Sequence, residues 1–326
     1  MSERHLSPTA TEAGQNLVSN GSTVPGVLRV HVTGSSGLVG RRLCLSLQDN
    51  GHEVRRLVRR KDETGPRALL WNPAGDQVDQ AVLEGADVVV HLAGENIADK
   101  RWSDKQKRVI RESRTTSTAN LARTIAAMEN PPATFVCASA IGFYGSRGDE
   151  QLDESSEPGE GFLADVCKGW ENACEPARQA GVRVVNVRTG MVLSGDGGAL
   201  AKMLTPFRMG VGGVLGSGKQ YMSWIEVDDL VRLIVFSMTA TSLKGPVNAV
   251  APKPVTNKEF TKTLGRVLGR PTIMPMPAFA ARLAFGEMAD ELLLSSARVY
   301  PKQAEESGFR FLHADLESAL RHTLDK

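Results

Sequence analysis

The chain has 326 residues, which is enough to bury a full core in one large domain or in two. Its 39 basic and 37 acidic residues nearly balance and the basic ones are scattered, which excludes a basic surface for nucleic acid or anionic membranes. No apolar run approaches the roughly 18 residues that a membrane-spanning helix needs.

The N-terminal segment and the cysteines bear on the location of the protein. Residues 1–26 are rich in Ser, Thr, Gly and Asn and lack the apolar stretch of a secretory signal, so we interpret them as a disordered leader. Glu3 and Glu12 disfavour a transit peptide, which is the alternative. The four cysteines have no metal-ligand spacing and fall in expected core elements, as in a reducing compartment. We predict a cytoplasmic protein without a metal site.

One stretch near the N-terminus has the pattern of a strand, a glycine turn and a helix. The apolar run Leu28–Val32 predicts a buried parallel strand, Gly34, Gly37 and Gly40 follow it, and leucines at helical spacing then lead to Gly51. Such a turn lets a pyrophosphate approach the backbone and bind the free N–H groups of the helix, although a tight turn without a ligand is the alternative. The predicted cofactor contacts here are Gly34, Ser35, Ser36, Gly37, Leu38 and Val39.

The next predicted strand, Glu53–Val58, ends in the basic run Arg59-Arg60-Lys61. An NAD site usually has an acid at this position for the ribose 2′-hydroxyl, whereas an NADP site offers arginine to the 2′-phosphate. A guanidinium is always charged and can bind phosphate through two donors. Arg59 and Arg60 therefore favour NADP over NAD, with a solvated basic loop as the alternative.

Strands and helices continue to alternate after this point. The predicted elements are a strand at Ala68–Trp71, a helical turn at Asp76–Leu83, a strand at Ala86–Gly94, a helix at Ser103–Met128, a strand at Ala133–Ser139, a helix at Gly161–Gln179 and a strand at Val182–Val187. This alternation predicts an α/β fold with a Rossmann doubly wound parallel sheet. Because open α/β sheets bind ligands at their strand ends, Leu92, Ala93, Gly94 and Glu95 are predicted to contact the cofactor.

From Gly195 the sequence becomes rich in glycine, and the stretches Gly195–Gly198 and Gly210–Gly218 predict loops that shape a pocket or, alternatively, a flexible linker. The later predicted elements are a helix that starts within Trp224–Leu230 with Asp228 or Asp229 as its N-cap, a strand at Pro246–Val250, a helix opened by a capping box at Thr256–Glu259, and helices at Ala278–Leu294 and Ala314–Leu324. We predict an NADP-binding domain at residues 27–190, on which residues 220–250 pack back. A smaller C-terminal α/β substrate lobe follows at 191–326, with a helical block from about residue 275.

A set of motifs resembles the extended short-chain dehydrogenase/reductases, the nucleotide-sugar epimerase group. The motifs are Thr33–Gly40, His91–Gly94, Tyr144-Gly145, Val227–Asp229 and Asn248. More narrowly, the chain resembles an atypical epimerase-family branch, also named SulA-like cell-division inhibitors, that ends in a small domain of unknown function. That likeness rests on Ala93–Ile97, Arg101-Trp102, Ser113-Arg114, Trp170-Glu171, Pro206–Gly210, Gly216–Gly218 and the block from about Pro275. The resemblance covers residues 27 to about 323 and implies an NAD(P)-dependent oxidoreductase or epimerase.

The same resemblance shows where this chain departs from the larger family, which works through Asn, Ser or Thr, and a Tyr-x-x-x-Lys pair. Leu163 falls at the position of the tyrosine that exchanges a proton, and Cys167 falls at the position of the lysine. The serine position falls on Ala140, beside Ser139, and the asparagine position falls on Arg114. Because leucine has no proton to exchange, a standard reaction would need another proton carrier.

The candidates for that role are weak. Ser139 and Tyr144 are the two catalytic candidates, although Ser139 could instead hydrogen-bond the nicotinamide and a structural role is usual for Tyr144 in the family. Cys167 is more simply a buried thiol, and Lys168 a solvated lysine. Arg114 would project toward the cofactor as a fixed cation, with a surface ion pair as the alternative. The residues predicted to line the substrate pocket are Tyr144, Arg188, Tyr221 and Trp224, with core aromatics and a structural arginine as the alternative.

Two functions stay open on the sequence alone. The first is an NADP(H)-dependent reductase or epimerase-like oxidoreductase that acts on an unknown small molecule with non-standard proton transfer. The second is a non-catalytic regulatory protein that binds NADPH and signals to a partner. The missing standard residues favour the second function, and the retained glycine turn and glycine-rich segment favour the first. We expect no nucleic-acid or membrane partner, and the oligomeric state is open.

Overall fold

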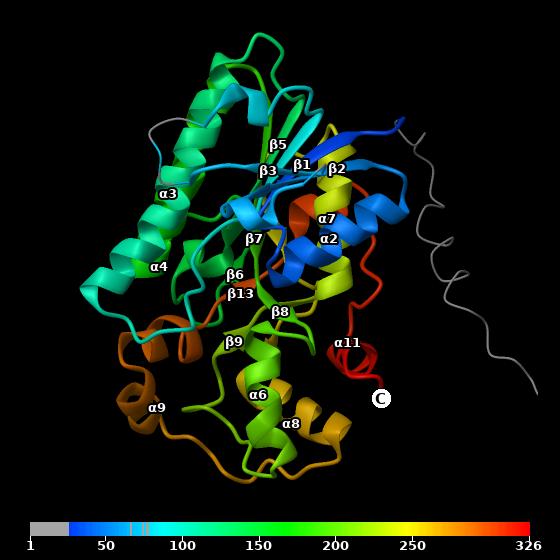
Figure 1. Ribbon diagram of the computed structural model, residues 1–326. Coiled ribbons are helices and arrows are strands. Elements are labelled where there is room, and N and C mark those ends of the chain that lie inside the picture. The colour runs from blue at the N-terminus through cyan, green and yellow to red at the C-terminus, as the bar shows by residue number, and fades with distance from the viewer. Residues whose placement is uncertain (1–25, 66, 74, 76–77) are drawn as a thin grey trace, which may run out of the picture.

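The computed structural model describes residues 26–65, 67–73, 75 and 78–326, so almost all of the predicted leader and part of the helical turn predicted at 76–83 lie outside the described residues. A seven-stranded parallel sheet forms the centre of the molecule, in the order β11-β7-β5-β4-β1-β2-β3 (Figure 1). Its strands are β1 (Arg29–Thr33), β2 (Glu53–Val58), β3 (Ala68–Leu70), β4 (Val88–His91), β5 (Thr134–Ala140), β7 (Arg183–Thr189) and β11 (Gly245–Ala249). The predicted doubly wound Rossmann sheet is confirmed.

The strand order reverses between β1 and β4. From β1 the chain runs outward through β2 and β3, then returns to place β4 on the other side of β1. Thr33 and His91 are partners at the carboxyl ends of these two strands. In open α/β sheets a ligand binds beside such a reversal, which is where the glycine turn follows β1.

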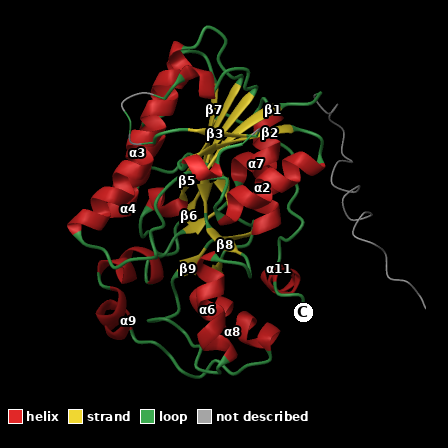
Figure 2. Ribbon diagram, viewed as in Figure 1, coloured by secondary structure: helices red, strands yellow, loops and turns green. Residues whose placement is uncertain are grey.

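Helices cover both faces of the sheet (Figures 1 and 2). The helices are α2 (Leu38–Asp49) and α7 (Val227–Thr239) on one face, and α3 (Asp104–Ala127), α4 (Phe162–Asn172) and α5 (Glu175–Gln179) on the other. Leu43 and Leu47 of α2, four residues apart, pack with α7 and the sheet in one core cluster. Leu121 of α3 and Trp170 of α4 belong to the cluster of the opposite face.

The helix predicted at Gly161–Gln179 is in fact two helices, α4 and α5. Ala173 is the C-cap of α4, and Pro176 lies in the first turn of α5. Proline lacks the N–H that a continuous helix would need, and it is tolerated in a first turn. Short 3-10 turns occupy Lys61–Glu63, Gln80–Val82 and Ile141–Tyr144.

The later part of the chain builds a second lobe from short strands and helices (Figure 2). The elements outside the sheet and its covering helices, some in this lobe and some between it and the sheet, are β6 (Gln151–Leu152), β8 (Met191–Leu193), α6 (Gly198–Arg208), β9 (Tyr221–Met222), β10 (Trp224–Glu226), β12 (Val255–Thr256), α8 (Asn257–Leu268), α9 (Ala278–Phe285), a π-helical turn (Ala289–Leu293), β13 (Arg298–Val299), α10 (Lys302–Glu306) and α11 (Leu316–Thr323). Strand β8 pairs with β10, β9 with β12, and β6 with β13. Residues of α6, α8 and α11 share one core cluster.

Several predictions for this lobe need correction. Helix α6 lies between the two glycine-rich stretches, which are loops as expected apart from Gly198, and it was not predicted; Leu200, Leu204 and Phe207 bury one face of it. The N-cap of α7 is Glu226, whose carboxylate accepts hydrogen bonds from two amides of the first turn, and neither of the two predicted aspartates. The helix predicted at Ala278–Leu294 breaks at Gly286, where φ is +63°. The predicted capping box of α8 is confirmed.

Residues after 275 do not form a body of their own. Strand β13 pairs with β6, α10 packs on β11 of the central sheet, and α11 packs on α8. Within the part of the chain that the structure describes, no helix is both long and apolar enough to cross a membrane.

Candidate functional site

The glycine turn between β1 and α2 is closely packed by backbone atoms. Gly34 has a φ of +67°, and a Cβ there would lie 2.7 Å from the carbonyl group of Leu92. A Cβ on Gly40 would overlap the carbonyl oxygen of Gly34. Gly37 is the extended N-cap residue of α2, and it offers no side chain to the amides of the first helical turn. These amides are therefore free to bind an anion, as the sequence predicts.

A buried threonine–histidine pair joins the ends of β1 and β4. Thr33 Oγ1 lies 2.7 Å from His91 Nδ1 and accepts hydrogen bonds from the amides of Leu92 and Ala93 at 3.2 and 3.3 Å. Because that oxygen already accepts twice, its proton goes to His91 Nδ1, and the neutral imidazole carries its own proton on Nε2, toward Ser117. Burial lowers the pKa of His91 to about 3. The pair therefore holds the backbone of Leu92 and Ala93, two of the predicted cofactor contacts after β4.

Arg114 lies directly under those contacts. Its guanidinium donates to the carbonyl oxygens of Ile110 at 3.0 Å and Glu95 at 2.9 Å, and a Cβ on Gly94 would lie 3.3 Å from Arg114 Cζ. Burial lowers the pKa of this guanidinium from its ordinary value. The carboxylate of Glu95 lies 3.6 Å from Lys100, and no ion pair to Arg114 occurs in the described part of the chain. The surface ion pair that was the alternative is absent there, and a half-buried cation is left that could bind an anionic ligand.

The two arginines predicted to bind the 2′-phosphate follow the end of β2. Arg59 and Arg60 are both exposed. Arg60 Nε lies 3.3 Å from Asp62 and 2.9 Å from Glu63, whereas Arg59 forms no ion pair among the described residues. A phosphate could therefore bind Arg59 directly, whereas at Arg60 it would have to compete with the carboxylates of Asp62 and Glu63.

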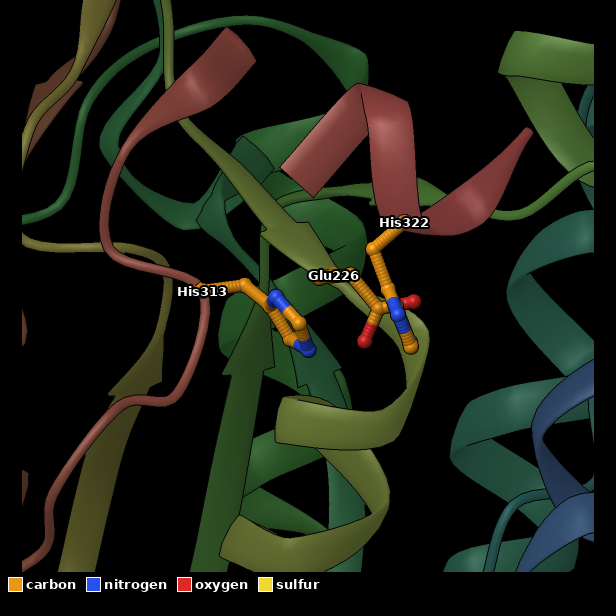
Figure 3. Close-up of side chains that lie close together, drawn as sticks. All are labelled: Glu226, His313 and His322. Atoms are coloured by element: carbon orange, nitrogen blue, oxygen red, sulfur yellow. The ribbon is translucent and has the colours of Figure 1, made fainter. Parts of the chain in front are cut away.

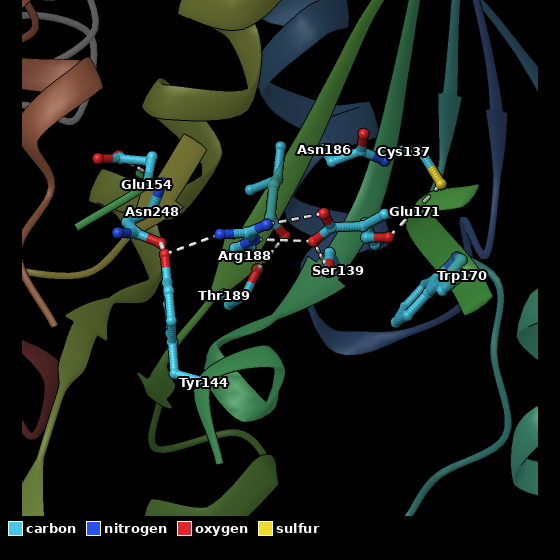
Figure 4. Close-up of polar contacts among 12 residues, drawn as sticks. Cys137, Ser139, Tyr144, Glu154, Trp170, Glu171, Asn186, Arg188, Thr189 and Asn248 are labelled. Atoms are coloured by element: carbon cyan, nitrogen blue, oxygen red, sulfur yellow. Dashed lines mark hydrogen bonds and ion pairs between the residues drawn. The ribbon is translucent and has the colours of Figure 1, made fainter. Parts of the chain in front are cut away.

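Ser139 and Tyr144, the two catalytic candidates, belong to one buried network (Figure 4). Ser139 donates to Glu171 Oε1 at 2.7 Å, and Arg188 binds both oxygens of the same carboxylate at 2.8 and 2.9 Å. A third nitrogen of Arg188 donates to Tyr144 Oη at 2.9 Å, and that hydroxyl donates to Asn248 Oδ1 at 2.7 Å. The polar groups of both candidates are therefore occupied by protein partners.

Three of the four residues predicted to line the substrate pocket are interior residues. Tyr144 and Trp224 are fully buried and Arg188 is 3 % exposed, which corrects the expectation of an accessible lining. Burial raises the pKa of Tyr144 to about 12, which makes it a poor proton donor near neutral pH. Trp224 lies in the core of the second lobe. Tyr221 is half-buried, under the guanidinium of Arg298 at 4.9 Å.

The first turn of α4 holds Leu163 at the position where the larger family has tyrosine. The amides of Phe162 and Leu163 donate to the carboxylate of Glu291 at 3.2 Å each. Cys167, one turn further on, is buried, and burial raises the pKa of its thiol to about 12. Lys168 forms a surface ion pair of 2.7 Å with Asp165, in agreement with a solvated lysine. Local sequence patterns did not identify Glu291, because it contacts α4 from a segment far along the chain.

The chain matches two known families and many individual proteins. Residues 30–250 match the NAD dependent epimerase/dehydratase family, and residues 276–323 match a domain of unknown function, DUF1731. An epimerase family protein of Mycobacterium tuberculosis is 46% identical over 291 residues, which are 89% of this chain and 96% of that protein. The epimerase family protein YfhF of Bacillus subtilis is 36% identical over 297 residues, which are 90% of this chain and 97% of that protein.

Solved structures give the same result. A crystal structure of human epimerase family protein SDR39U1 with NADPH is similar at a TM-score of 0.84 and 32% identity, over 92% of this chain and 100% of that one. A nucleoside-diphosphate sugar epimerase from Corynebacterium glutamicum has a TM-score of 0.77 and 41% identity, over 92% of this chain and 58% of that one. These matches support the epimerase family with its C-terminal domain, and they do not support the cell-division name.

Proposed function

The chain belongs to the NAD dependent epimerase/dehydratase family. We propose that it binds NADP(H) at the carboxyl edge of its sheet and acts as an oxidoreductase-like protein on an unknown small molecule. The observation that carries this proposal is the uncapped first turn of α2 after Gly34 and Gly37, close to the buried pair of Thr33 and His91. The NADPH in the crystal structure of human SDR39U1 supports the choice of cofactor.

The residues fit such a cofactor along its length. The glycine turn leaves room for a pyrophosphate, and the amides of α2 would bind its oxygens. Arg59 and Arg60 would bind the 2′-phosphate, and Arg114 would supply a positive charge beneath Gly94 and Glu95. When bound, the cofactor supplies or accepts a hydride.

A non-catalytic NADPH-binding regulator is the second candidate function. It is favoured by the aliphatic Leu163 at the tyrosine position and by Tyr144, whose hydroxyl is held by Arg188 and Asn248. Oxidation of NADPH that depends on a fraction of a metabolite pool would support the oxidoreductase. No oxidation across broad pools, together with a partner retained only in the presence of NADPH, would support the regulator.

Arg59→Ala/Arg60→Ala is expected to weaken NADPH binding by at least about tenfold, because charged hydrogen bonds to phosphate contribute about 1.5–3 kcal/mol. NADH lacks the 2′-phosphate, so its weaker binding should not change. Fluorescence titration of the purified chain with each nucleotide measures both affinities. Arg55→Ala, an exposed arginine of β2, is the matched control. Equal losses for the two nucleotides would contradict recognition of the 2′-phosphate.

Arg114→Met is expected to lower the NADPH affinity by about tenfold or more, because it removes a half-buried positive charge beneath the predicted cofactor contacts. Arg114→Lys should retain part of the affinity, since it keeps the charge but not the forked geometry. The same titration measures both variants, and thermal unfolding of each shows whether it is folded. If folded Arg114→Met binds NADPH as well as the wild type, Arg114 supports the loop and not the cofactor.

We propose a cytoplasmic protein whose partner is a small molecule, with no nucleic-acid or membrane ligand. One relative, from Arabidopsis thaliana, is 40% identical over 305 residues and is named chloroplastic. The cell-division role attached to the resemblance has no support in the site, and we do not propose it.

A further inference from the structure

Three side chains from distant segments of the chain converge beside the first turn of α7 (Figure 3). Glu226 comes from the end of β10, His313 from the segment before α11, and His322 from α11 itself. One ligand atom of each, a carboxylate oxygen or a ring nitrogen, lies within 4.8 Å of the other two. The cluster has no short sequence spacing, and the prediction of no metal site rested on such spacing alone.

The backbone that carries His313 is fixed by a buried aspartate. Asp229 is fully buried, and its carboxylate accepts hydrogen bonds from the amides of Leu312 at 3.0 Å and His313 at 2.8 Å. The same carboxylate pairs with Arg232 at 2.6 Å. The backbone of His313 is thus held in place before any ligand binds, which lowers the entropic cost of binding.

The cluster has donor capacity that the protein does not use. The Oε2 atom of Glu226 caps α7, whereas Oε1 has only a long 3.4 Å contact with the hydroxyl of Thr323. His313 Nδ1 is buried and has no hydrogen-bond partner among the described residues. The two imidazole rings stack with their centroids 4.2 Å apart. A buried ring nitrogen without a partner is costly, and a metal or a proton donor would relieve that cost.

A second carboxylate borders the cluster on its solvent side. Asp228 Oδ2 lies 3.2 Å from His322 Nε2, and Asp228 Oδ1 lies 2.9 Å from Arg42 of α2. Both Asp228 and His322 keep almost half of their side chains exposed, so an ion could enter from this side. Asp228 could act as a fourth ligand or could orient His322 from outside the coordination sphere.

We propose that Glu226, His313 and His322 bind one divalent transition-metal ion of the zinc type. Two imidazole nitrogens and one carboxylate oxygen are a donor set suited to Zn²⁺, whereas Mg²⁺ and Ca²⁺ prefer oxygen ligands only. The ion would join α11 to the start of α7 and so fasten the C-terminal segment to the helix that packs on the central sheet. The site is separate from the glycine turn, and it does not depend on NADP(H) binding.

Equilibrium dialysis of the full chain, freed of any histidine tag, against Zn²⁺ in excess Mg²⁺ tests the proposal. We expect one zinc per chain and a higher thermal midpoint in the presence of Zn²⁺, since a ligand of the native state stabilises it. His313→Gln and His322→Gln should each lower the zinc affinity by at least about tenfold. His52→Gln is the matched control, because His52 lies outside the cluster.

Two outcomes would overturn the site. One is a wild-type chain that retains no zinc, and the other is zinc binding that neither histidine variant weakens, which would place the metal on cysteines or on other histidines. Circular dichroism of each variant shows whether it is folded. Zinc dialysis and NADPH titration together separate the metal site from the proposed function, because either ligand can fail to bind while the other binds.

Discussion

Replacing Arg188 with methionine will lower the free energy of unfolding by about 3–5 kcal/mol, because the carboxylate of Glu171 is then left buried without its cation. Arg188 and Glu171 are joined by two hydrogen bonds, and their side chains are only 4% and 10% exposed. Arg188 also donates to Tyr144, and its Cζ lies 3.5 Å from the ring centroid of Phe143. Urea unfolding of the wild type and the variant at pH 7 measures the difference.

A double-mutant cycle identifies the source of that loss. Arg188→Met/Glu171→Leu removes both charges, so its destabilisation should be smaller than the sum of the two single variants. Arg321→Met is a matched control, because Arg321 and Glu317 form an exposed pair that contributes at most about 1 kcal/mol. A loss of less than about 1 kcal/mol for Arg188→Met would contradict the buried ion pair.

Acidification will destabilise the chain through His91, by about 3 kcal/mol between pH 6.5 and pH 4. Burial lowers the pKa of His91 to about 3 in the folded chain, from 6.5 in the unfolded chain. The unfolded state therefore takes up a proton first as the pH falls. Stability from neutral His91 is fully present above pH 6.5 and is lost as the pH falls toward 3. Urea unfolding at half-unit steps from pH 7 to pH 4 measures the slope.

The variant His91→Asn isolates this contribution from those of other groups. An asparagine can still accept a hydrogen bond near the position of Nδ1, but it does not titrate. Buried carboxylates act in the opposite direction, since burial raises the pKa of Glu154 and of Glu226. These groups are common to both proteins and drop out of the comparison. If the wild type and His91→Asn lose stability with the same slope, His91 is not the cause.

Local sequence patterns predicted much of the fold, because the parallel sheet depends on them. A buried strand, a glycine turn and a leucine-spaced helix are all encoded within Leu28–Gly51, and the same change of period recurs along the first half of the chain. Arg114 was predicted to project toward the cofactor from its place on a long helix; its guanidinium donates to the carbonyl oxygen of Glu95, and its role toward a cofactor stays a prediction.

The parts that sequence patterns missed depend on long-range pairs. The contact of Glu291 with α4 spans more than a hundred residues, and the cluster of Glu226, His313 and His322 joins three segments. Burial was the other difficulty, because an aromatic residue suits a pocket and a core equally well. Trp224 was predicted to line the pocket for that reason, and it is a core residue.

The position of β11 at the edge of the sheet has a consequence for synthesis on the ribosome. The chain leaves the sheet after β7, builds β8, α6, β9 and β10, and returns only with α7 and β11 at residues 227–249. The nascent sheet therefore exposes an unpaired edge along β7 while more than fifty further residues are translated. Such an edge can pair with another chain, so chaperone dependence and aggregation should concentrate in this interval of translation.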